Sequence, residues 1–269
     1  MEWSQAAAKA FRGFLAEASG FYHGLLRKME ADFGLSLDLP AGDGALAGGG
    51  GRPELLSCHR SLVFLGDLAR YREQHREGGR RDWAAAANYY HQAVRLLPDF
   101  GNPHNQLAVL ATYADDDCSA LYRYCRALCL LQPFGTAADN MKLLFQKNRE
   151  KLAAMGVNVK PKSRGAQQET VLRRFCTRFV RLHGMLTARG GALEGFAALQ
   201  DAVGQDITFL GNGGVLTQEL TLMLVLINIY SVYAAARCAP GLESGTLEVV
   251  MCASTQFSFF RSFPTQAPA

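Results

Sequence analysis

The sequence predicts an all-α protein built from helical hairpins, and two observations carry that prediction. Apolar residues recur at spacings of three and four along most of the chain, which is the period of an amphipathic helix. A pattern near the middle of the chain returns after 35 residues, close to the period of a tetratricopeptide hairpin. With 269 residues, 49% of them hydrophobic, the chain can form one large or two small domains.

The first helix is predicted from about Trp3 to Phe33. Its buried face is expected to consist of six apolar residues at helical spacing: Phe14, Ala18, Phe21, Leu25, Met29 and Phe33. The proline- and glycine-rich segment Pro40–Pro53 then predicts a flexible loop without packing value.

A second helix is predicted from about Glu54 to Arg76, and its sequence "SCHRSLVFLGDLARYREQ" mixes arginines with apolar residues. The apolar set expected to form its buried stripe is Leu62, Val63, Leu65, Leu68, Ala69 and Tyr71. Arg70 follows Asp67 by three positions, so the two side chains are neighbours on one helix face. A carboxylate that holds an arginine beside the Tyr71 phenol suits a phosphate site, but a purely structural ion pair has the same spacing.

The repeat consists of "AAAANYYHQAVRLLP", which ends at Pro98, and "CSALYRYCRALCLLQP", which ends at Pro133. Small residues early in each copy allow close helix approach, and the proline ends the helix because it has no N–H to donate. The first helices of the two hairpins are then predicted at Leu62–Tyr71 and Pro103–Tyr113. Two repeats alone are marginally stable, so flanking helices should cap them.

The rest of the chain predicts three further helices. One runs over Thr136–Ala153, and a basic amphipathic helix runs over Glu169–Thr187 with Val171, Phe175, Phe179, Leu182 and Leu186 on its apolar side. After a turn at "LGNGG" comes Leu220–Ala236, seventeen residues without a charge. A bilayer needs about 20 apolar residues, so this segment is expected to be a buried core helix.

Charge and cysteine content limit the function classes. From Lys142 to Arg189 twelve Lys and Arg face two Glu, a local net charge of +10, which indicates either an acidic partner or a solvated helix face. The seven cysteines contain no CxxC pair and are expected to be reduced thiols of a cytoplasmic or nuclear protein. Charged residues near the N-terminus, Glu2, Lys9 and Arg12, do not fit a signal peptide.

The chemistry-bearing motifs do not point to an enzyme. No catalytic triad pattern, phosphate-binding glycine loop or zinc set is recognisable, so no catalytic residue, metal or cofactor is predicted. The run Asp115, Asp116, Asp117 precedes a helix, where an aspartate is expected to cap the free amide groups rather than bind a metal.

Several long motifs in order resemble one known family. The segments "SCHRSLVFLGDLARYR", "AAAANYYHQAVRLLPDFGNPHNQLAVLA" and "ALYRYCRALCLLQPF", with "FLAEASGFYHGLL" before them and "FVRLHGML" after, resemble the SMG adaptors of nonsense-mediated mRNA decay. These adaptors are relatives of the ever-shorter-telomeres telomerase subunit, and the likeness is strongest to plant members. It is strong over Phe11–Ala153 and weaker over Thr170–Ala236.

The resemblance implies a 14-3-3-like fold of tetratricopeptide hairpins at residues 1–153, without the family's first helices. A basic linker at 154–168, a partial helical-hairpin, α-solenoid-like domain at 169–260 and a disordered tail at 261–269 would follow. The family recognises phosphoserine or phosphothreonine on the RNA helicase that drives decay. The implied phosphate site is Arg70 with Tyr71, oriented by Asp67 and assisted by Asn105, but the family's phosphate-binding lysine and its long C-terminal region have no counterpart here.

The implied partners are the phosphorylated helicase and other SMG-type adaptors, in the cytoplasm, including processing bodies, with a nuclear pool and no membrane. The alternative is a telomerase-associated protein that binds RNA or single-stranded telomeric DNA. Its candidate contacts are Lys160, Lys162, Arg164, Arg173 and Arg174. The third hypothesis is a helical scaffold with an inactive phosphate pocket.

Overall fold

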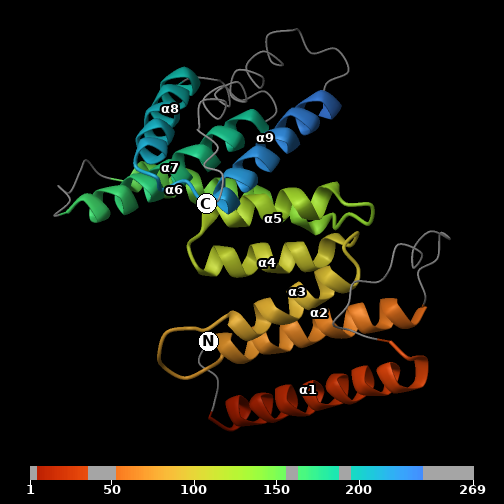
Figure 1. Cartoon of the computed structure of the whole chain (residues 1–269). Helices are drawn as coiled ribbons and strands as arrows, with labels where there is room; N and C mark the ends of the chain where they lie inside the picture. Colours follow the sequence, from red (N-terminus) through yellow and green to blue (C-terminus); the bar gives the residue numbers. More distant parts are fainter. Residues whose placement is uncertain (1–4, 36–52, 156–162, 188–194, 239–269) are drawn as a thin grey trace, which may run out of the picture. The chain divides into compact units, whose positions relative to one another are not determined.

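The computed structural model describes residues 5–35, 53–155, 163–187 and 195–238, and within these ranges the chain is all-α (Figure 1). This confirms the predicted fold class. One isolated bridge between Phe100 and Gln132 is the only β pairing in the described ranges. The helices are α1 (Gln5–Phe33), α2 (Pro53–Gln74), α3 (Ala84–Leu96), α4 (Gly101–Tyr113), α5 (Asp117–Cys129), α6 (Thr136–Ala154), α7 (Arg164–Thr187), α8 (Phe196–Asn212) and α9 (Gln218–Cys238).

Two helices differ from the sequence prediction. Helix α7 begins at Arg164 rather than Glu169, so the last five residues of the expected linker are helical. They contain Ala166, Gln167 and Gln168, which favour a helix once Ser163 caps its first turn by accepting a bond from the Ala166 amide (3.2 Å). Helix α8 was not predicted, because Gly204 and Gly211 interrupt its pattern and it follows a glycine-rich stretch.

The described helices fall into two compact units. The first consists of Met1–Leu110 with Arg126–Ala137, and the second of Ala111–Cys125 with Ala138–Ala269. The three limits fall within helices α4, α5 and α6, so each of these helices contributes residues to the two units.

In the first unit, α2 is the central helix and packs against α1 and α3 (Figure 1). Leu62, Val63, Leu65 and Ala69 of the predicted stripe are buried among side chains of α3 that include Tyr90 and Leu96. Two residues of the stripe are exceptions. Leu68 is half-buried and Tyr71 is 39% exposed, because both lie on the face that α2 turns toward α1 and solvent.

The buried stripe of α1 agrees only in part with the prediction: Met29 packs against the core of the first unit. Leu15 and Leu26 are the buried residues of this helix, whereas Phe14, Phe21 and Phe33 are 59%, 65% and 50% exposed. Two adjacent apolar stripes run along α1, and periodicity alone cannot tell which of them meets α2.

The segment that ends the second repeat is held by backbone contacts within the first unit. The Gly101 amide donates to the Gln132 carbonyl (2.9 Å), and the Phe134 amide donates to the Ala127 carbonyl (2.9 Å). A Cβ at Gly101 would come within 2.2 Å of the Ala127 oxygen, so only glycine fits at the start of α4.

In the second unit, α7 packs against α8 and α9. Val171, Phe175, Phe179 and Leu182 are buried as predicted, whereas Leu186 is half-buried. The polar residues of α9 are satisfied inside this core: Asn228 and Ser231 donate to the carbonyls of Leu224 (2.8 Å) and Ile227 (3.0 Å). None of the helices in the described ranges is long and apolar enough to cross a membrane.

The five cysteines whose side chains the structure describes carry free thiols, three of them buried. The predicted tail at 261–269, and Lys160 and Lys162 of the basic linker, lie outside the described residues.

Candidate functional site

The predicted neighbours Asp67 and Arg70 form an ion pair on α2, with Nη2 of Arg70 3.0 Å from Oδ1 of Asp67. A third residue joins them from α3. The Tyr90 hydroxyl donates to the same Asp67 oxygen (2.8 Å), and Nε of Arg70 donates to the Tyr90 hydroxyl (3.4 Å). Asp67, Arg70 and Tyr90 therefore form a closed hydrogen-bonded triad between two helices.

Gly66 makes this approach of α3 to α2 possible. A Cβ at this position would lie 2.3 Å from Cε1 of Tyr90, far inside van der Waals contact. The Tyr90 ring consequently packs on the bare backbone of α2, one residue before the carboxylate that its hydroxyl reaches. This explains the glycine in "LGDLARYR", which costs about 1 kcal/mol of helix propensity relative to alanine.

The triad is largely buried, and its environment shifts the pKa values of Arg70 and Tyr90. Arg70 is 9% exposed, and Tyr90 is fully buried. Burial opposes the charge of Arg70, but its hydrogen bonds to Tyr90 and Asp67 outweigh burial and raise the pKa of the guanidinium above its ordinary value. Burial, together with the Asp67 carboxylate, raises the pKa of Tyr90, so this phenol stays protonated at neutral pH.

Tyr71 also lies against the guanidinium. The Arg70 Cζ is 4.4 Å from the centre of the Tyr71 ring, a cation–π distance. Asn105, the fourth residue predicted for this site, lies on α4 and is 3% exposed, so it offers little surface to an external phosphate.

A groove runs along α1 and α2 beside this cluster, with a volume of about 540 Å³. Asp67 and Tyr71 lie in its wall, and a second carboxylate, Glu17, lines it from α1. The full lining is Phe14, Glu17, Ala18, Phe21, Tyr22, Phe64, Asp67, Leu68 and Tyr71. The groove is thus aromatic and acidic.

The arginines predicted to contact nucleic acid are mostly engaged by acidic residues. Arg174 binds the Asp206 carboxylate of α8 with Nη2 (2.5 Å) and Nε (3.2 Å), and Arg178 binds the same carboxylate (2.8 Å). Arg173 pairs with Glu169 at 2.6 Å on the helix surface, with 65% of its side chain exposed. Arg164 is exposed at the start of α7.

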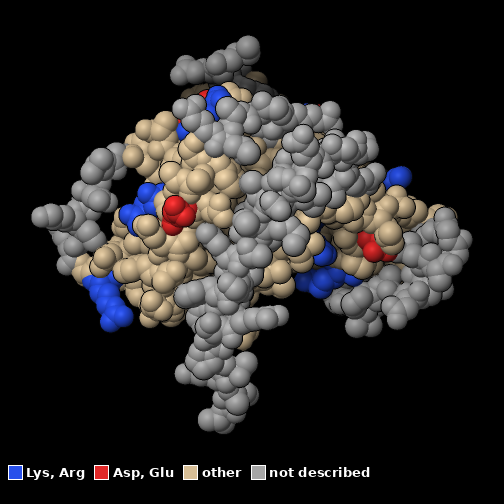
Figure 2. Space-filling view, turned by 90° about the horizontal axis from the view of Figure 1, so that it is seen from above, with Lys and Arg blue, Asp and Glu red and all other residues tan. Residues whose placement is uncertain are grey.

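On the face drawn in Figure 2, several Lys and Arg side chains are visible outside the grey area, some of them next to Asp or Glu side chains.

A family model described as "Est1 DNA/RNA binding domain" matches residues 86–263, which is more than half of the chain. The chain belongs to this family. The match includes Tyr90 but begins after Asp67 and Arg70, so the α2 part of the triad lies outside it.

Curated members of the Est1 family are similar over longer stretches. The nonsense-mediated mRNA decay factor SMG7 of Arabidopsis thaliana is 37% identical over 218 residues, 66% of this chain and 21% of that protein. The SMG7-like decay factor of the same plant is 43% identical over 142 residues, 52% of this chain and 15% of that protein. The chain therefore spans about a fifth of the length of these relatives or less, and the predicted resemblance to the SMG adaptors is confirmed.

The fold agrees as well. A solved structure, "Crystal structure of Est1 and Cdc13", superposes with a TM-score of 0.62 at 15% identity, over 77% of this chain and 43% of that one. The helical fold is thus of the predicted 14-3-3-like class.

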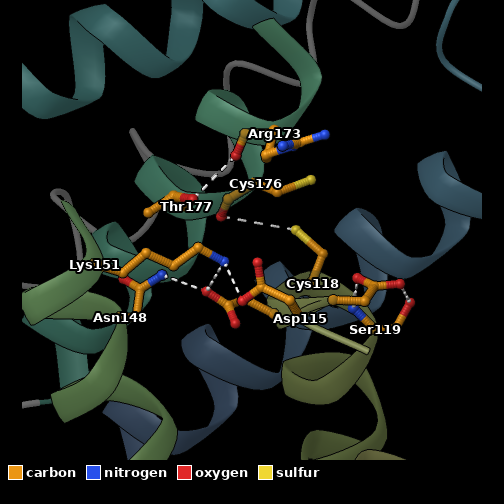
Figure 3. Close-up of polar contacts among 10 residues, drawn as sticks. Asp115, Cys118, Ser119, Asn148, Lys151, Arg173, Cys176 and Thr177 are labelled. Atoms are coloured by element: carbon orange, nitrogen blue, oxygen red, sulfur yellow. Dashed lines mark hydrogen bonds and ion pairs between the residues drawn. The ribbon is translucent and has the colours of Figure 1, made fainter. Parts of the chain in front are cut away.

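This Est1-family chain has a second polar cluster in its second unit (Figure 3). Lys151 of α6 donates to Asp115 (2.8 Å) and Asp117 (3.4 Å), and Asn148 donates to Asp117 (3.0 Å). Partial burial favours the neutral amine of Lys151, but the two carboxylates outweigh it and raise its pKa. This network ties the start of α5 to the end of α6.

The aspartate run serves the helix start, as predicted. Asp116 caps α5, because its carboxylate accepts bonds from the Ser119 amide (3.0 Å) and the Ser119 hydroxyl (2.6 Å). Asp115 takes the left-handed conformation (φ 59°) that lets the chain turn into the cap. Within the described ranges, no group of three or more His, Cys, Asp or Glu could hold a metal ion.

A cavity of about 300 Å³ adjoins this cluster, and Cys118 and Cys176 line it. The Cys118 thiol lies 3.9 Å from the Cys176 carbonyl oxygen. Its contact with Cys176 and its burial raise the pKa of Cys118 well above the ordinary value, so it is a protonated thiol rather than a nucleophile.

Sequence reasoning did not identify Tyr90, Asp206 or Lys151. Tyr90 has the signature of a core aromatic, and its role depends on a contact 23 positions away. Asp206 lies in the helix that was not predicted, so the sequence did not indicate that Arg174 and Arg178 are paired.

Proposed function

We propose that this chain is a non-enzymatic adaptor of nonsense-mediated mRNA decay that binds phosphoserine or phosphothreonine in a phosphorylated RNA helicase. Its relatives support the pathway, since they include the decay factors SMG7 and SMG5. Other SMG-type adaptors would be its further partners, and the cytoplasm, with a nuclear pool, its place of action.

The observation that carries the proposal is the fixed position of Arg70. Asp67 holds Nη2 and Tyr90 holds Nε, so the guanidinium is oriented before any ligand arrives. In the proposed complex, the phosphate binds the Nη1 edge of Arg70 and the Tyr71 hydroxyl. Since Tyr71 is 39% exposed, its ring can turn away from Arg70 at little cost in packing.

The surroundings predict modest affinity. Glu17 and Asp67 are the charged residues that line the adjoining groove, and both repel a phosphate. A hydrogen bond to a charged group contributes about 1.5–3 kcal/mol, so one arginine without a second cation supports weak, phosphate-dependent binding.

The test is fluorescence polarisation with a phosphoserine peptide and its unphosphorylated twin. Arg70→Lys keeps the charge but removes the planar guanidinium that Asp67 and Tyr90 orient, and Tyr71→Phe removes the hydroxyl while keeping the ring. Arg72→Glu is the matched control, because Arg72 is an exposed arginine two positions away on the same helix. Circular dichroism melting of each variant verifies the fold.

We expect phosphate-dependent binding that both Arg70→Lys and Tyr71→Phe weaken at least tenfold more than Arg72→Glu does. Equal binding of the two peptides by the wild type would mean that Arg70 is a structural residue and that the phosphate site is inactive.

Nucleic-acid binding is the second candidate, because the matching family model is described as a DNA/RNA binding domain. Arg164 and Arg173 are the described candidates with exposed side chains, whereas Arg174 is held by Asp206. Binding to single-stranded RNA should then weaken steeply with salt and fall further in an Arg164→Glu, Arg173→Glu double variant. An RNA affinity that changes neither with the salt concentration nor in the double variant would exclude this candidate.

A further inference from the structure

The second unit brings together two cysteines that lie 58 positions apart in the chain. Cys118 is the second residue of α5, and its Sγ atom lies 3.9 Å from the backbone carbonyl oxygen of Cys176 on α7. Figure 3 shows the Cys118 side chain directed at the turn of α7 that carries Cys176. The two thiols are also within hydrogen-bonding reach of each other. A disulfide requires two side chains that approach each other in this way.

Both cysteines lie on backbone that their surroundings hold in place. At the start of α5, the carboxylate of Asp116 accepts bonds from the amide and the hydroxyl of Ser119, the residue after Cys118. On α7, Cys176 lies between Phe175 and Thr177, which are both fully buried. The approach of the two sulfur atoms is therefore a property of the packed helices.

The two thiols differ in their access to solvent. Cys118 is 1% exposed, whereas Cys176 is only partly buried. Both line the cavity of about 300 Å³, together with the cationic side chains of Lys151 and Arg173. Hydrogen peroxide is little larger than a water molecule, so this cavity can admit it. Because Cys118 is a buried, protonated thiol, Cys176 is the sulfur that reacts with an oxidant first.

We propose that Cys118 and Cys176 are a peroxide-sensitive thiol pair that forms an intramolecular disulfide between α5 and α7. In the first step the Cys176 sulfur attacks one oxygen of hydrogen peroxide. The S–O bond forms, the O–O bond breaks, and the thiol proton leaves with the second oxygen as water. In the second step the Cys118 sulfur bonds to the sulfenic sulfur of Cys176, and its proton leaves with the sulfenic hydroxyl as a second water.

The disulfide would join the start of α5 to the middle of α7 and close a long loop in the second unit. Cross-links that close long loops stabilise a fold, chiefly by restricting the unfolded chain. Thiol reductants reverse the reaction by exchange, so in a reducing compartment the bond is a transient response to peroxide. Neither cysteine belongs to the first unit, which contains Arg70, so this response is separate from the proposed phosphate site.

The test detects the bond by mass spectrometry. The full chain is treated with hydrogen peroxide, denatured in the presence of an alkylating reagent and digested with trypsin. Cleavage at Arg123 separates Cys118 from the later cysteines of α5, and cleavage at Arg174 and Arg178 releases Cys176 in a short peptide. We expect the Cys118 peptide to be linked to the Cys176 peptide after peroxide, and the link to disappear after dithiothreitol.

Variants assign the order of the two steps. In Cys118→Ser the Cys176 sulfenic acid should persist and react with dimedone, at least about fivefold more than in the wild type. Cys176→Ser should leave Cys118 as an unmodified thiol. Cys129→Ser is the matched control, because Cys129 is an exposed thiol at the end of the same helix, and it should form the linked peptide as the wild type does.

Thermal melting gives a second measurement that does not depend on the variants folding well. The oxidised wild type should melt at least about 5 °C above the reduced protein, because the closed loop restricts its unfolded state. The shift should be absent when dithiothreitol follows the peroxide.

Three outcomes would overturn the proposal. In the first, peroxide oxidises Cys176 to the sulfinic acid without any link to Cys118. In the second, Cys118 links to other cysteines as readily as to Cys176. In the third, the oxidised protein melts below the reduced one, which would mean that the bond forms only in a distorted fold.

Discussion

The Tyr90 hydroxyl donates a 2.8 Å hydrogen bond to the Asp67 carboxylate, which lies on the neighbouring helix 23 positions earlier in the chain. The same oxygen accepts the Nη2 bond of Arg70. The position of Arg70 is therefore set jointly by α2 and α3, and the "GDLARYR" motif acts only together with the tyrosine that packs on its glycine.

Tyr90→Phe should destabilise the protein, because it removes the phenol that pairs with Asp67 and Arg70 in a buried site. The expected loss is about 1–2 kcal/mol of unfolding free energy, the cost of leaving buried polar groups unpaired. Urea denaturation measures it. Tyr89→Phe is the control, since the Tyr89 hydroxyl bonds His23 at an exposed position (2.9 Å) and should cost less. Equal losses would contradict a special role for the Tyr90 hydroxyl.

Gly66→Ala should also be destabilising, although alanine is the better helix former. Its Cβ would lie 2.3 Å from the Tyr90 ring, so α3 must shift, at a cost of about 1–3 kcal/mol. Gly20→Ala meets no atom within 4 Å and should instead gain about 0.5–1 kcal/mol. Chemical denaturation of the two variants checks the opposite signs, and a stabilised Gly66→Ala protein would refute the packing argument.

Asp206→Asn should weaken the second unit. The carboxylate is 3% exposed and serves both Arg174 and Arg178, which are 31% and 27% exposed. We expect a loss of about 2–3 kcal/mol, below the 3–5 kcal/mol of a fully buried pair because water reaches the arginines. The exposed Arg173–Glu169 pair provides the comparison: Glu169→Gln should change stability by less than about 0.5 kcal/mol. Equal losses of thermal stability in the Asp206→Asn and Glu169→Gln variants would contradict this prediction.

Acidification should destabilise the fold through buried histidines. Burial lowers the pKa of His183 to about 3, and its Nδ1 lies 2.7 Å from the Ser231 hydroxyl oxygen. Because the folded pKa lies below the ordinary value, stability is complete above pH 6.5 and falls as the pH decreases toward 3. His59 acts in the same direction, since burial and Arg60 lower its pKa to about 4.

Each of the two histidines should contribute a loss of about 2 kcal/mol between pH 6.5 and pH 5. In His183→Asn the change in unfolding free energy between these two pH values should be smaller by the contribution of this one histidine. Denaturant titrations at several pH values measure it, and an unchanged slope would show that His183 titrates normally.

Much of the fold was accessible from the sequence because most helices have one clear apolar stripe. The Asp67–Arg70 pair was accessible for the same reason, since three positions place two side chains on one helix face. Helix α8 could not be predicted, because its internal glycines weaken both the helix propensity and the apolar periodicity of this segment. Its omission also hid Asp206, and with it the neutralisation of Arg174 and Arg178.

The buried side of α1 could not be predicted from periodicity. The stripe with Phe14 and Phe21 and the stripe with Leu15 and Leu26 are both apolar, and only tertiary packing decides between them. Tyr90 was missed for a related reason: nothing local in "AAAANYYHQAV" distinguishes a tyrosine that fills space from one that orients a carboxylate.

The glycines of α1, Gly13, Gly20 and Gly24, affect how readily this helix unfolds locally. A helix that packs along one side only, against α2, and carries three glycines on the other should open locally well below the global unfolding free energy. Its backbone amides would then exchange with deuterium faster than those of α2, which is packed on two sides.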